Sequence, residues 1–311
     1  MGASLATKRS FLVTSYDVPT RLRGNMRNLT QDTITDYIAS SFDTADKNRQ
    51  TQLMTGFVRC LHGFIRDVDL SHGEWVKLLD FFYQVGEKTS EARDEFMLLS
   101  DVMGITSLVD LLAASKNPEV TPASPLGPFY LENAPVIHQG GMLCTDDEPG
   151  IPLVFNGVVT DEQGAVINNA LLDIWHNAES GLYSNEDETQ DDMNNRGRIY
   201  TDEQGKFIVK TIRPQPYSVP MDGPVGDLLK AFDRSPWRSA HLHVVVSAPG
   251  CESVITELFF SDCEYIDTDA VGGVRAELTH VPRYRTTERG ETLFVEHHFR
   301  LRSLAQEPSR L

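Results

Sequence analysis

Polar and apolar side chains alternate in the stretch Ser239-Ala240-His241-Leu242-His243-Val244-Val245-Val246. Its apolar and β-branched residues, followed by the turn-forming Ser247-Ala248-Pro249-Gly250, predict a β-strand. Because successive side chains of a strand point to opposite faces, His241 and His243 lie on one face. Two imidazoles side by side on a rigid element form half of a metal site. Taken alone, the stretch leaves open a second interpretation, two structural histidines in a half-buried strand.

Residues from about 31 to 115 repeat their apolar positions at helical spacing. Ser71 and Glu74 have the spacing of a capping box, which predicts the start of one helix. The apolar stripes exceed what one small bundle needs to bury, so they favour a helical contact between two copies of the chain. The stripes are Ile34, Tyr37, Ile38 and Phe42; Leu53, Phe57, Leu61, Phe64 and Ile65; and Trp75, Leu78, Leu79 and Phe82.

The pattern changes after Ser115, where prolines become frequent up to residue 152 and helical periodicity is lost. From Leu153 onward, short β-type segments alternate with turns. The sequence Thr-Asp-Glu-Gln-Gly occurs at 160–164 and again at 201–205, and both copies predict hairpin turns in which glycine supplies the positive φ. We therefore predict a mainly β protein with an α-helical N-terminal region: a helical linker and dimerisation region over 1–125 and an antiparallel β-sandwich over 126–311.

Composition narrows the possible partners and location. The chain of 311 residues carries a net charge of −17, which argues against nucleic acid or an anionic membrane as the main partner. Four scattered cysteines without a C-x-x-C pair fit the reduced thiols of a cytoplasmic protein. No apolar run approaches the roughly 20 residues that span a bilayer. The first residues lack a signal-peptide core and predict a flexible lead-in.

Two tyrosines occupy positions where predicted strands end. Tyr183 follows the strand that ends at His176, and Tyr217 follows the strand that ends at Ile212. Loop side chains at strand ends often converge on a functional site. Each tyrosine alone is equally consistent with ordinary packing against a sheet.

Together with the two histidines, these tyrosines give the chain a resemblance to the intradiol ring-cleaving dioxygenases. The matching segments extend through most of the chain, from about residue 30 to 300. They are Asp173-Ile174-Trp175-His176, Gly181-Leu182-Tyr183, Pro216-Tyr217, Asp222 to Gly226, Arg238 to His243, Ser247 to Gly250 and, in the helical and linker regions, Leu98 to Gly104 and Leu126 to Phe129.

The resemblance implies a non-haem Fe(III) ion, one per subunit, held by Tyr183, Tyr217, His241 and His243. Two phenolates are hard anionic donors that stabilise trivalent iron, and the charge of the ion lowers the pKa of the phenols. The implied reaction is intradiol cleavage of an aromatic diol by O2, in which the phenolate of Tyr217 is displaced by substrate. Arg238 matches an arginine of the family that stabilises negative charge developing on substrate.

Within this family the resemblance is strongest to the hydroxyquinol 1,2-dioxygenases, notably over Pro216 to Gly226 and at Leu98 and Asp101. This implies cleavage of 1,2,4-trihydroxybenzene to maleylacetate or 3-hydroxy-cis,cis-muconate. A buried third hydroxyl needs a hydrogen-bond partner, and the carboxylate of Asp101 is a candidate. The alternative for Asp101 is a helix-end residue that faces solvent or a backbone amide.

The remaining predicted substrate contacts are the apolar side chains of Leu98, Val219 and Pro220, with Arg238 and Glu257. Glu257 is a departure from the family, because catechol-cleaving members commonly have glutamine there. It leaves open whether Glu257 pairs with Arg238 or acts in another way.

Three other functions remain possible from the residues. They are cleavage of catechol or chlorocatechol, zinc-dependent hydrolysis by the two histidines with Glu257, and ligand binding by a β-sandwich module without catalysis. The expected partners are a small aromatic diol or triol and O2. The resemblance further implies a homodimer through the N-terminal helices, with a phospholipid bound there in some members.

Overall fold

A computed structural model describes residues 26–43, 48–90 and 93–304 of the chain. The predicted lead-in lies outside these residues. The chain forms two compact units, 1–79 and 80–311, and the long helix α3 crosses the boundary between them. This boundary between the compact units differs from the predicted division into 1–125 and 126–311. That division stays a prediction.

The first unit is helical, as its periodicity predicts. It contains the short helix η1 (Met26–Asn28), α1 (Ile34–Ser41), α2 (Arg49–Asp67) and the start of α3 (His72–Lys88). Ser71 and Glu74 form the predicted capping box, since the backbone N–H of Ser71 donates to Glu74 Oε2 at 2.9 Å. Arg66 and Arg59 of α2 donate to Thr35 and Asp36, and these contacts hold α1 against α2.

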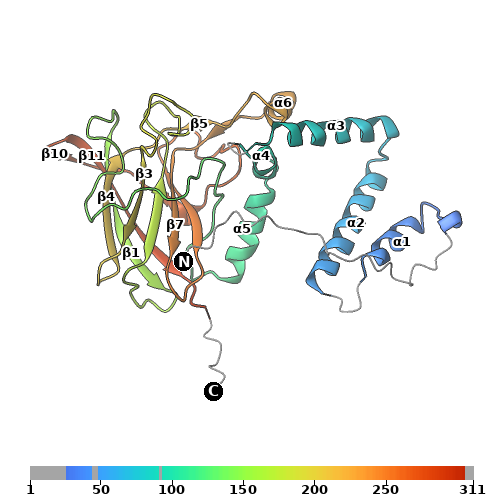
Figure 1. Cartoon of the computed structure of the whole chain (residues 1–311), viewed down its shortest axis with the longest axis horizontal. Coiled ribbons are helices and arrows are strands. Elements are labelled where there is room, and N and C mark those ends of the chain that lie inside the picture. Colours follow the sequence, from blue (N-terminus) through green and yellow to red (C-terminus); the bar gives the residue numbers. More distant parts are fainter. Residues whose placement is uncertain (1–25, 44–47, 91–92, 305–311) are drawn as a thin grey trace, which may run out of the picture. The chain divides into compact units, whose positions relative to one another are not determined.

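The second unit contains a β-sandwich, which confirms the predicted fold class (Figure 1). One sheet has the strand order β10-β11-β1-β4 and the other the order β3-β2-β7-β8-β9, while β5 and β6 form a separate pair. The strands are β1 (Pro152–Asp161), β2 (Leu171–Trp175), β3 (Arg196–Tyr200), β4 (Lys206–Ile212), β5 (Tyr217–Ser218), β6 (Trp237–Arg238), β7 (His241–Ser247), β8 (Val254–Phe260), β9 (Thr279–His280), β10 (Arg283–Thr287) and β11 (Gly290–Leu301).

The sandwich differs from the prediction in two details. Its sheets are mixed, because β1 pairs in parallel with β11 and β8 pairs in parallel with β9. The turn at 201–205 is not a hairpin, because it joins β3 in one sheet to β4 in the other. The two identical turns still share one local structure: Asp161 accepts from the backbone of Gln163, and Asp202 accepts in the same way from Gln204.

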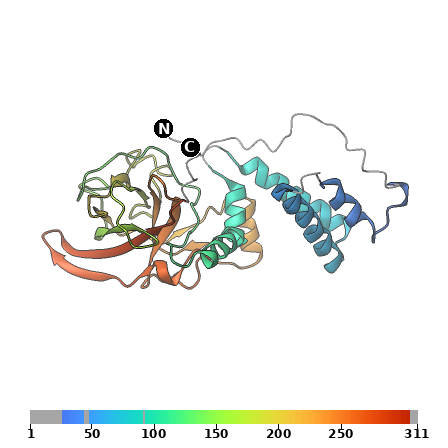
Figure 2. The same ribbon diagram turned by 90° about the horizontal axis from the view of Figure 1, so that it is seen from below.

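The core of the sandwich lies between the two main sheets. Leu172 and Val244 on one sheet and Phe155 and Phe299 on the other are fully buried there. The hairpin of β10 and β11 extends beyond this core as a long arm (Figure 2).

Helices α4 (Glu95–Val102), α5 (Ile105–Lys116) and α6 (Pro224–Ala231), with the short η2 (Ala276–Leu278), complete the second unit. Gly104 separates α4 from α5 with a φ of +68°. Ser107 on α5 donates to the carbonyl of Val271, which fixes that helix to a loop of the sandwich. Among the described residues, no single helix has the length and apolar composition to cross a membrane. Helices α4 and α5 together have that length and composition, but the chain bends by 65° between them.

Candidate active site

The two histidines of β7 point to one side of their sheet and converge with a tyrosine. His241 Nε2 lies 3.0 Å from His243 Nε2, and His243 Nε2 lies 3.1 Å from the phenol oxygen of Tyr183. Metal–nitrogen bonds of roughly 2.1 Å that meet at right angles place their ligand atoms about 3 Å apart. The spacing of these donor atoms therefore fits a single ion.

Tyr217 joins this group from β5. Its ring centroid lies 5.4 Å from that of Tyr183 and 5.6 Å from that of His241. All four side chains are buried. The structure therefore brings together the four donors that the sequence singled out, although they come from β7, from β5 and from the loop after β2.

Aromatic rings fix the orientation of these donors. Trp175 stacks on His243 with a centroid distance of 4.6 Å and an interplanar angle of 1°. Phe129 stacks on Tyr183 at 4.7 Å. The backbone must approach His243 closely at Gly127, whose φ is +74° and where an added Cβ would lie 3.4 Å from His243 Cε1.

Burial keeps the donors uncharged in the absence of a cation. It lowers the pKa of His241 and lowers that of His243 well below the ordinary value, so both imidazoles are neutral. It raises the pKa of Tyr217 to about 12 and that of Tyr183 well above 10. His241 Nδ1 donates to the carbonyl of Ser239 at 2.6 Å, which leaves the lone pair on Nε2 facing the other donors. A cation that binds here meets two neutral imidazoles and two phenols, and it must displace the protons of both phenols. Such a set of donors suits a hard, highly charged ion.

Arg238 lies beside these donors in β6, directly opposite Tyr217 of β5. Its guanidinium donates to both oxygens of Glu257, at 2.9 and 3.0 Å, and through Nε to Asp269 at 3.0 Å. Although burial opposes the charge, the carboxylates of Asp269 and Glu257 raise the pKa of Arg238 well above its usual value. Arg238 is thus a fixed cation at a buried position.

Glu257 on β8 therefore pairs with Arg238, which answers the question that the sequence left open. It also accepts a hydrogen bond from Ser124. With His241 and His243 it forms a group of three metal-type ligands whose donor atoms lie within 4.8 Å of one another. Both of its oxygens are already bonded to Arg238, so Glu257 is less available as a ligand than the two tyrosines.

A pocket of about 620 Å³ opens near the donors and has a partly apolar lining. Phe129, which stacks on Tyr183, contributes to it, as do the predicted substrate contacts Leu98 and Pro220. The other four predicted contacts are buried and do not line this pocket: Asp101, Val219, Arg238 and Glu257. The remaining lining residues are Arg93, Asp94, Pro128, Glu186, Ser218, Met221 and Asp222.

Asp101 on α4 is buried, which excludes the solvent-facing part of the alternative. Its Oδ1 accepts a hydrogen bond of 2.6 Å from Thr106, and burial raises its pKa to about 6. In the part of the chain that the structure describes, Oδ2 of Asp101 accepts no hydrogen bond. One lone-pair site of this carboxylate is therefore free for another donor.

The sequence did not single out Asp269 and Ser124. Asp269 holds Arg238 Nε and the backbone N–H of Ser239 with one oxygen and two backbone N–H groups of its own loop with the other. The local sequence does not predict their roles, because Ser124 bonds to Glu257 and Asp269 bonds to Arg238 across long separations in the chain.

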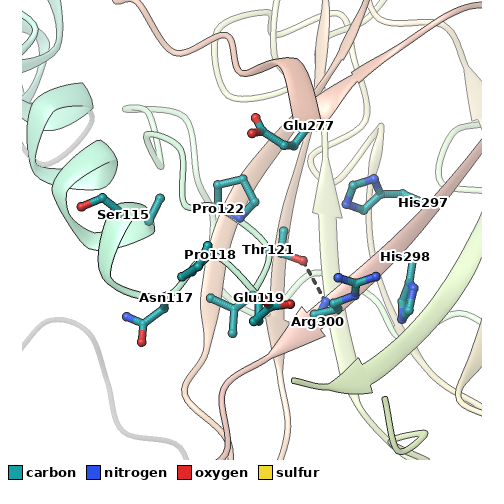
Figure 3. Close-up of a pocket in the computed structure, with 12 residues that line it drawn as sticks. Ser115, Asn117, Pro118, Glu119, Thr121, Pro122, Glu277, His297, His298 and Arg300 are labelled. Carbon is teal, nitrogen blue, oxygen red and sulfur yellow. Dashed lines mark hydrogen bonds between the residues drawn. The ribbon is translucent and has the colours of Figure 1, made fainter. Parts of the chain in front are cut away.

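The neighbouring His297 and His298 point to different sides of β11, as alternation predicts (Figure 3). They line a separate pocket of about 400 Å³ with Arg300 and Glu277. His298 bonds to Thr160, while His297 packs on Phe299 and on the ring of His280. Over the described residues, this pocket holds no group of three metal-type ligands.

Two family profiles match the chain. One, described as "Dioxygenase", matches residues 126–303, and the other, "Catechol dioxygenase N terminus", matches residues 47–121. Both main parts of the chain are thus accounted for by sequence families.

Individual proteins are similar to the chain over most of its length. A 6-chlorohydroxyquinol 1,2-dioxygenase of Cupriavidus pinatubonensis is 36% identical over 81% of this chain and 91% of its own length. A catechol 1,2-dioxygenase of Candida albicans is 33% identical over 78% of this chain and 82% of its own length. The crystal structure of a hydroxyquinol 1,2-dioxygenase from Pseudomonas putida superimposes with a TM-score of 0.79 at 35% identity, covering 88% of this chain and 98% of that one.

Proposed function

The chain belongs to the intradiol ring-cleavage dioxygenase family, and on this premise we propose that it is a hydroxyquinol 1,2-dioxygenase. It cleaves 1,2,4-trihydroxybenzene between adjacent hydroxyl groups with O2 and gives maleylacetate or its tautomer 3-hydroxy-cis,cis-muconate. The observation that carries the proposal is the convergence of two buried phenols and two neutral imidazoles beside a buried arginine.

In this proposal Tyr183, Tyr217, His241 and His243 hold one ferric ion per chain. Two phenolate oxygens favour trivalent iron, and such an ion supplies a Lewis-acidic centre that chelates the diol and makes it reactive toward O2. The protein contributes rigidity. Ser239 directs Nε2 of His241, and the stack with Trp175 holds the ring of His243.

Tyr217 has a second role as a proton acceptor. It lies on a strand of two residues, and burial, which in the absence of a cation raises its pKa to about 12, favours the protonated phenol over the phenolate. Its phenolate oxygen takes up a proton that the diol releases on binding. A diol that binds through both oxygens would release two protons, and Tyr217 would accept one of them.

Arg238 stabilises the negative charge that develops on substrate. Among the described residues, Glu257 and Asp269 accept from three of the five N–H groups of the guanidinium, which leaves two N–H groups for the reacting molecule. A fixed buried cation costs no reorganisation when charge develops beside it.

The choice of hydroxyquinol rests on Asp101. The buried Asp101 carries a free lone-pair site and lies one helical turn from Leu98, which lines the pocket. In this proposal the third hydroxyl reaches past Leu98 to this carboxylate, which does not itself line the pocket described above; without a partner, burial of the hydroxyl costs about 1–3 kcal/mol. Catechol and chlorocatechol lack this hydroxyl, so this site gives them no such contact.

Oxygen uptake measured side by side with 1,2,4-trihydroxybenzene and catechol tests the substrate. We expect the triol to have the higher kcat/KM, and Asp101→Ala to narrow the difference. A preference for catechol in the native enzyme contradicts the hydroxyquinol assignment and leaves catechol cleavage as the activity.

The ferric site is tested separately by colour and metal content. Tyrosinate bound to Fe(III) gives a broad visible charge-transfer band, and Tyr183→Phe is expected to remove the band or the iron. A colourless native protein that purifies with zinc supports the alternative of a zinc site made by His241, His243 and Glu257.

A further inference from the structure

His243 carries a buried polar atom for which the described structure shows no hydrogen-bond partner. This atom is Nδ1, on the opposite side of the ring from the Nε2 that faces Tyr183. Buried polar atoms are rarely left unpaired, because each costs about 1–3 kcal/mol. The atom therefore calls for an acceptor in the working enzyme.

Metal binding makes the need for an acceptor stronger. When Nε2 of a neutral imidazole binds an ion, the proton of the ring resides on Nδ1, which becomes an obligatory donor. His241 already satisfies this condition, because its Nδ1 donates to the carbonyl of Ser239. His243 has no backbone carbonyl in the same position.

Glu257 is placed to fill this role. It lies directly opposite His243 in the register of β7 and β8, and its Oε1 is 3.6 Å from His243 Nδ1. This distance is slightly longer than a hydrogen bond, and the same Oε1 lies 3.4 Å from Nε2 of His241. Glu257 cannot drift away, because Arg238 bonds to both of its oxygens and Ser124 bonds to Oε2.

We propose that Glu257 is a positioning residue, which fixes the ring of His243 for metal binding by accepting its Nδ1–H while it holds Arg238 toward the substrate. The proposal rests on the proposed ferric site. Through one carboxylate, the metal ligand His243 and the buried cation Arg238 keep a constant relative orientation. Glu257 acts on the reaction through these two residues and is not itself a ligand.

The test uses two substitutions of similar size, Glu257→Gln and Glu257→Met. Both remove the negative charge beside Arg238, but only glutamine keeps an oxygen that can accept the Nδ1–H of His243 or an N–H of Arg238, so the comparison is also made without Arg238. Iron retention against a chelator and the position of the tyrosinate charge-transfer band are measured for the purified ferric proteins. These readouts do not depend on turnover.

We expect the methionine variant to bind iron roughly 10- to 100-fold more weakly than the glutamine variant, as is usual when the partner of a metal-bound histidine is removed. The band should shift in the methionine variant and stay near its native position in the glutamine variant. Equal iron retention and equal spectra in the two variants overturn the proposal.

The comparison is repeated in an Arg238→Met background, in which neither Glu257 variant faces the guanidinium; Asp269 then keeps the hydrogen bonds from the backbone N–H groups of Ser239, Val271 and Gly273. The same difference between glutamine and methionine is expected there, and its absence again overturns the proposal. Failure of the ferric site itself gives a different result, since the native protein would then retain no iron and show no band.

Discussion

At the scale of single residues, alternation along the strand predicts that the two histidines share a face, whereas the two tyrosines were assigned to the site through the family resemblance. His241 and His243 are two apart on a strand, so a shared face follows from geometry alone, and the structure has both rings on one side of β7. What could not be predicted are the residues that hold them. Ser124 bonds to Glu257, and Asp269 bonds to Arg238. The members of each pair are far apart in the sequence, so the local sequence does not predict the contact.

The raised pKa of Asp101 leads to a prediction about stability. Burial raises its pKa to about 6 in the folded protein, above the ordinary value of 3.8. The folded state therefore favours the protonated form, and the stability from this group is lost as pH rises from about 4 to about 6. A shift of this size corresponds to roughly 2–3 kcal/mol.

Asp101→Asn removes the titration but keeps the shape of the side chain. We expect the melting temperature of the variant, relative to the native protein, to rise between pH 4 and pH 7. Thermal unfolding at intervals of one pH unit measures this. A difference that stays constant over the range contradicts the assignment of the raised pKa to Asp101.

At the scale of elements, alternating and β-branched segments bounded by turns were enough to predict that a β-sandwich follows the helical region. Which strands pair with one another was harder to predict from the sequence. The parallel contact of β1 with β11 joins Leu153 to Leu293, and no local pattern predicts which distant strand will be a neighbour. The turn at 201–205 was misassigned because the same turn chemistry serves a hairpin and a crossing between sheets.

The loop between β8 and η2 offers a prediction at this scale. Gly273 packs its backbone on the ion pair, and an added Cβ would lie 2.9 Å from Glu257 Oε2 and 3.0 Å from Arg238 Nη2. Both side chains are buried and bonded, so they cannot move away easily. We expect Gly273→Ala to lower kcat at least tenfold and to cost about 1–3 kcal/mol of stability.

Steady-state kinetics and thermal unfolding measure these two effects. Gly86→Ala is the matched control, because its Cβ would meet only Phe96, at 3.9 Å. Native kcat in the Gly273 variant would mean that the ion pair has no part in turnover.

At the scale of the whole molecule, helix α2 presents an apolar stripe to solvent. Phe57 is 58% exposed and Leu53 is 55% exposed, and Leu61 and Phe64 continue the same face. A contiguous apolar stripe of this kind marks an interaction surface. We propose that it forms the contact of a homodimer; a phospholipid bound there stays a prediction that a lipid extract of the purified protein can test.

Light scattering on the purified protein should give twice the chain mass of 34.8 kDa. Phe57→Asp is expected to shift the protein toward the monomer, because it places a charge within an apolar contact. Gln52→Asp puts the same charge on the polar side of the same helix and should leave the dimer intact. A monomeric native protein rules the dimer out.

The position of β11 has a consequence for biosynthesis. The strand lies inside its sheet, between β10 and β1, and it supplies Leu293, Val295 and Phe299 to the core. A nascent chain that has emerged from the ribosome only as far as β8 lacks this central strand, and one edge of β1 remains open. The sandwich must therefore wait for nearly complete translation before it closes, and the catalytic donors on β7 gain their final surroundings late in synthesis.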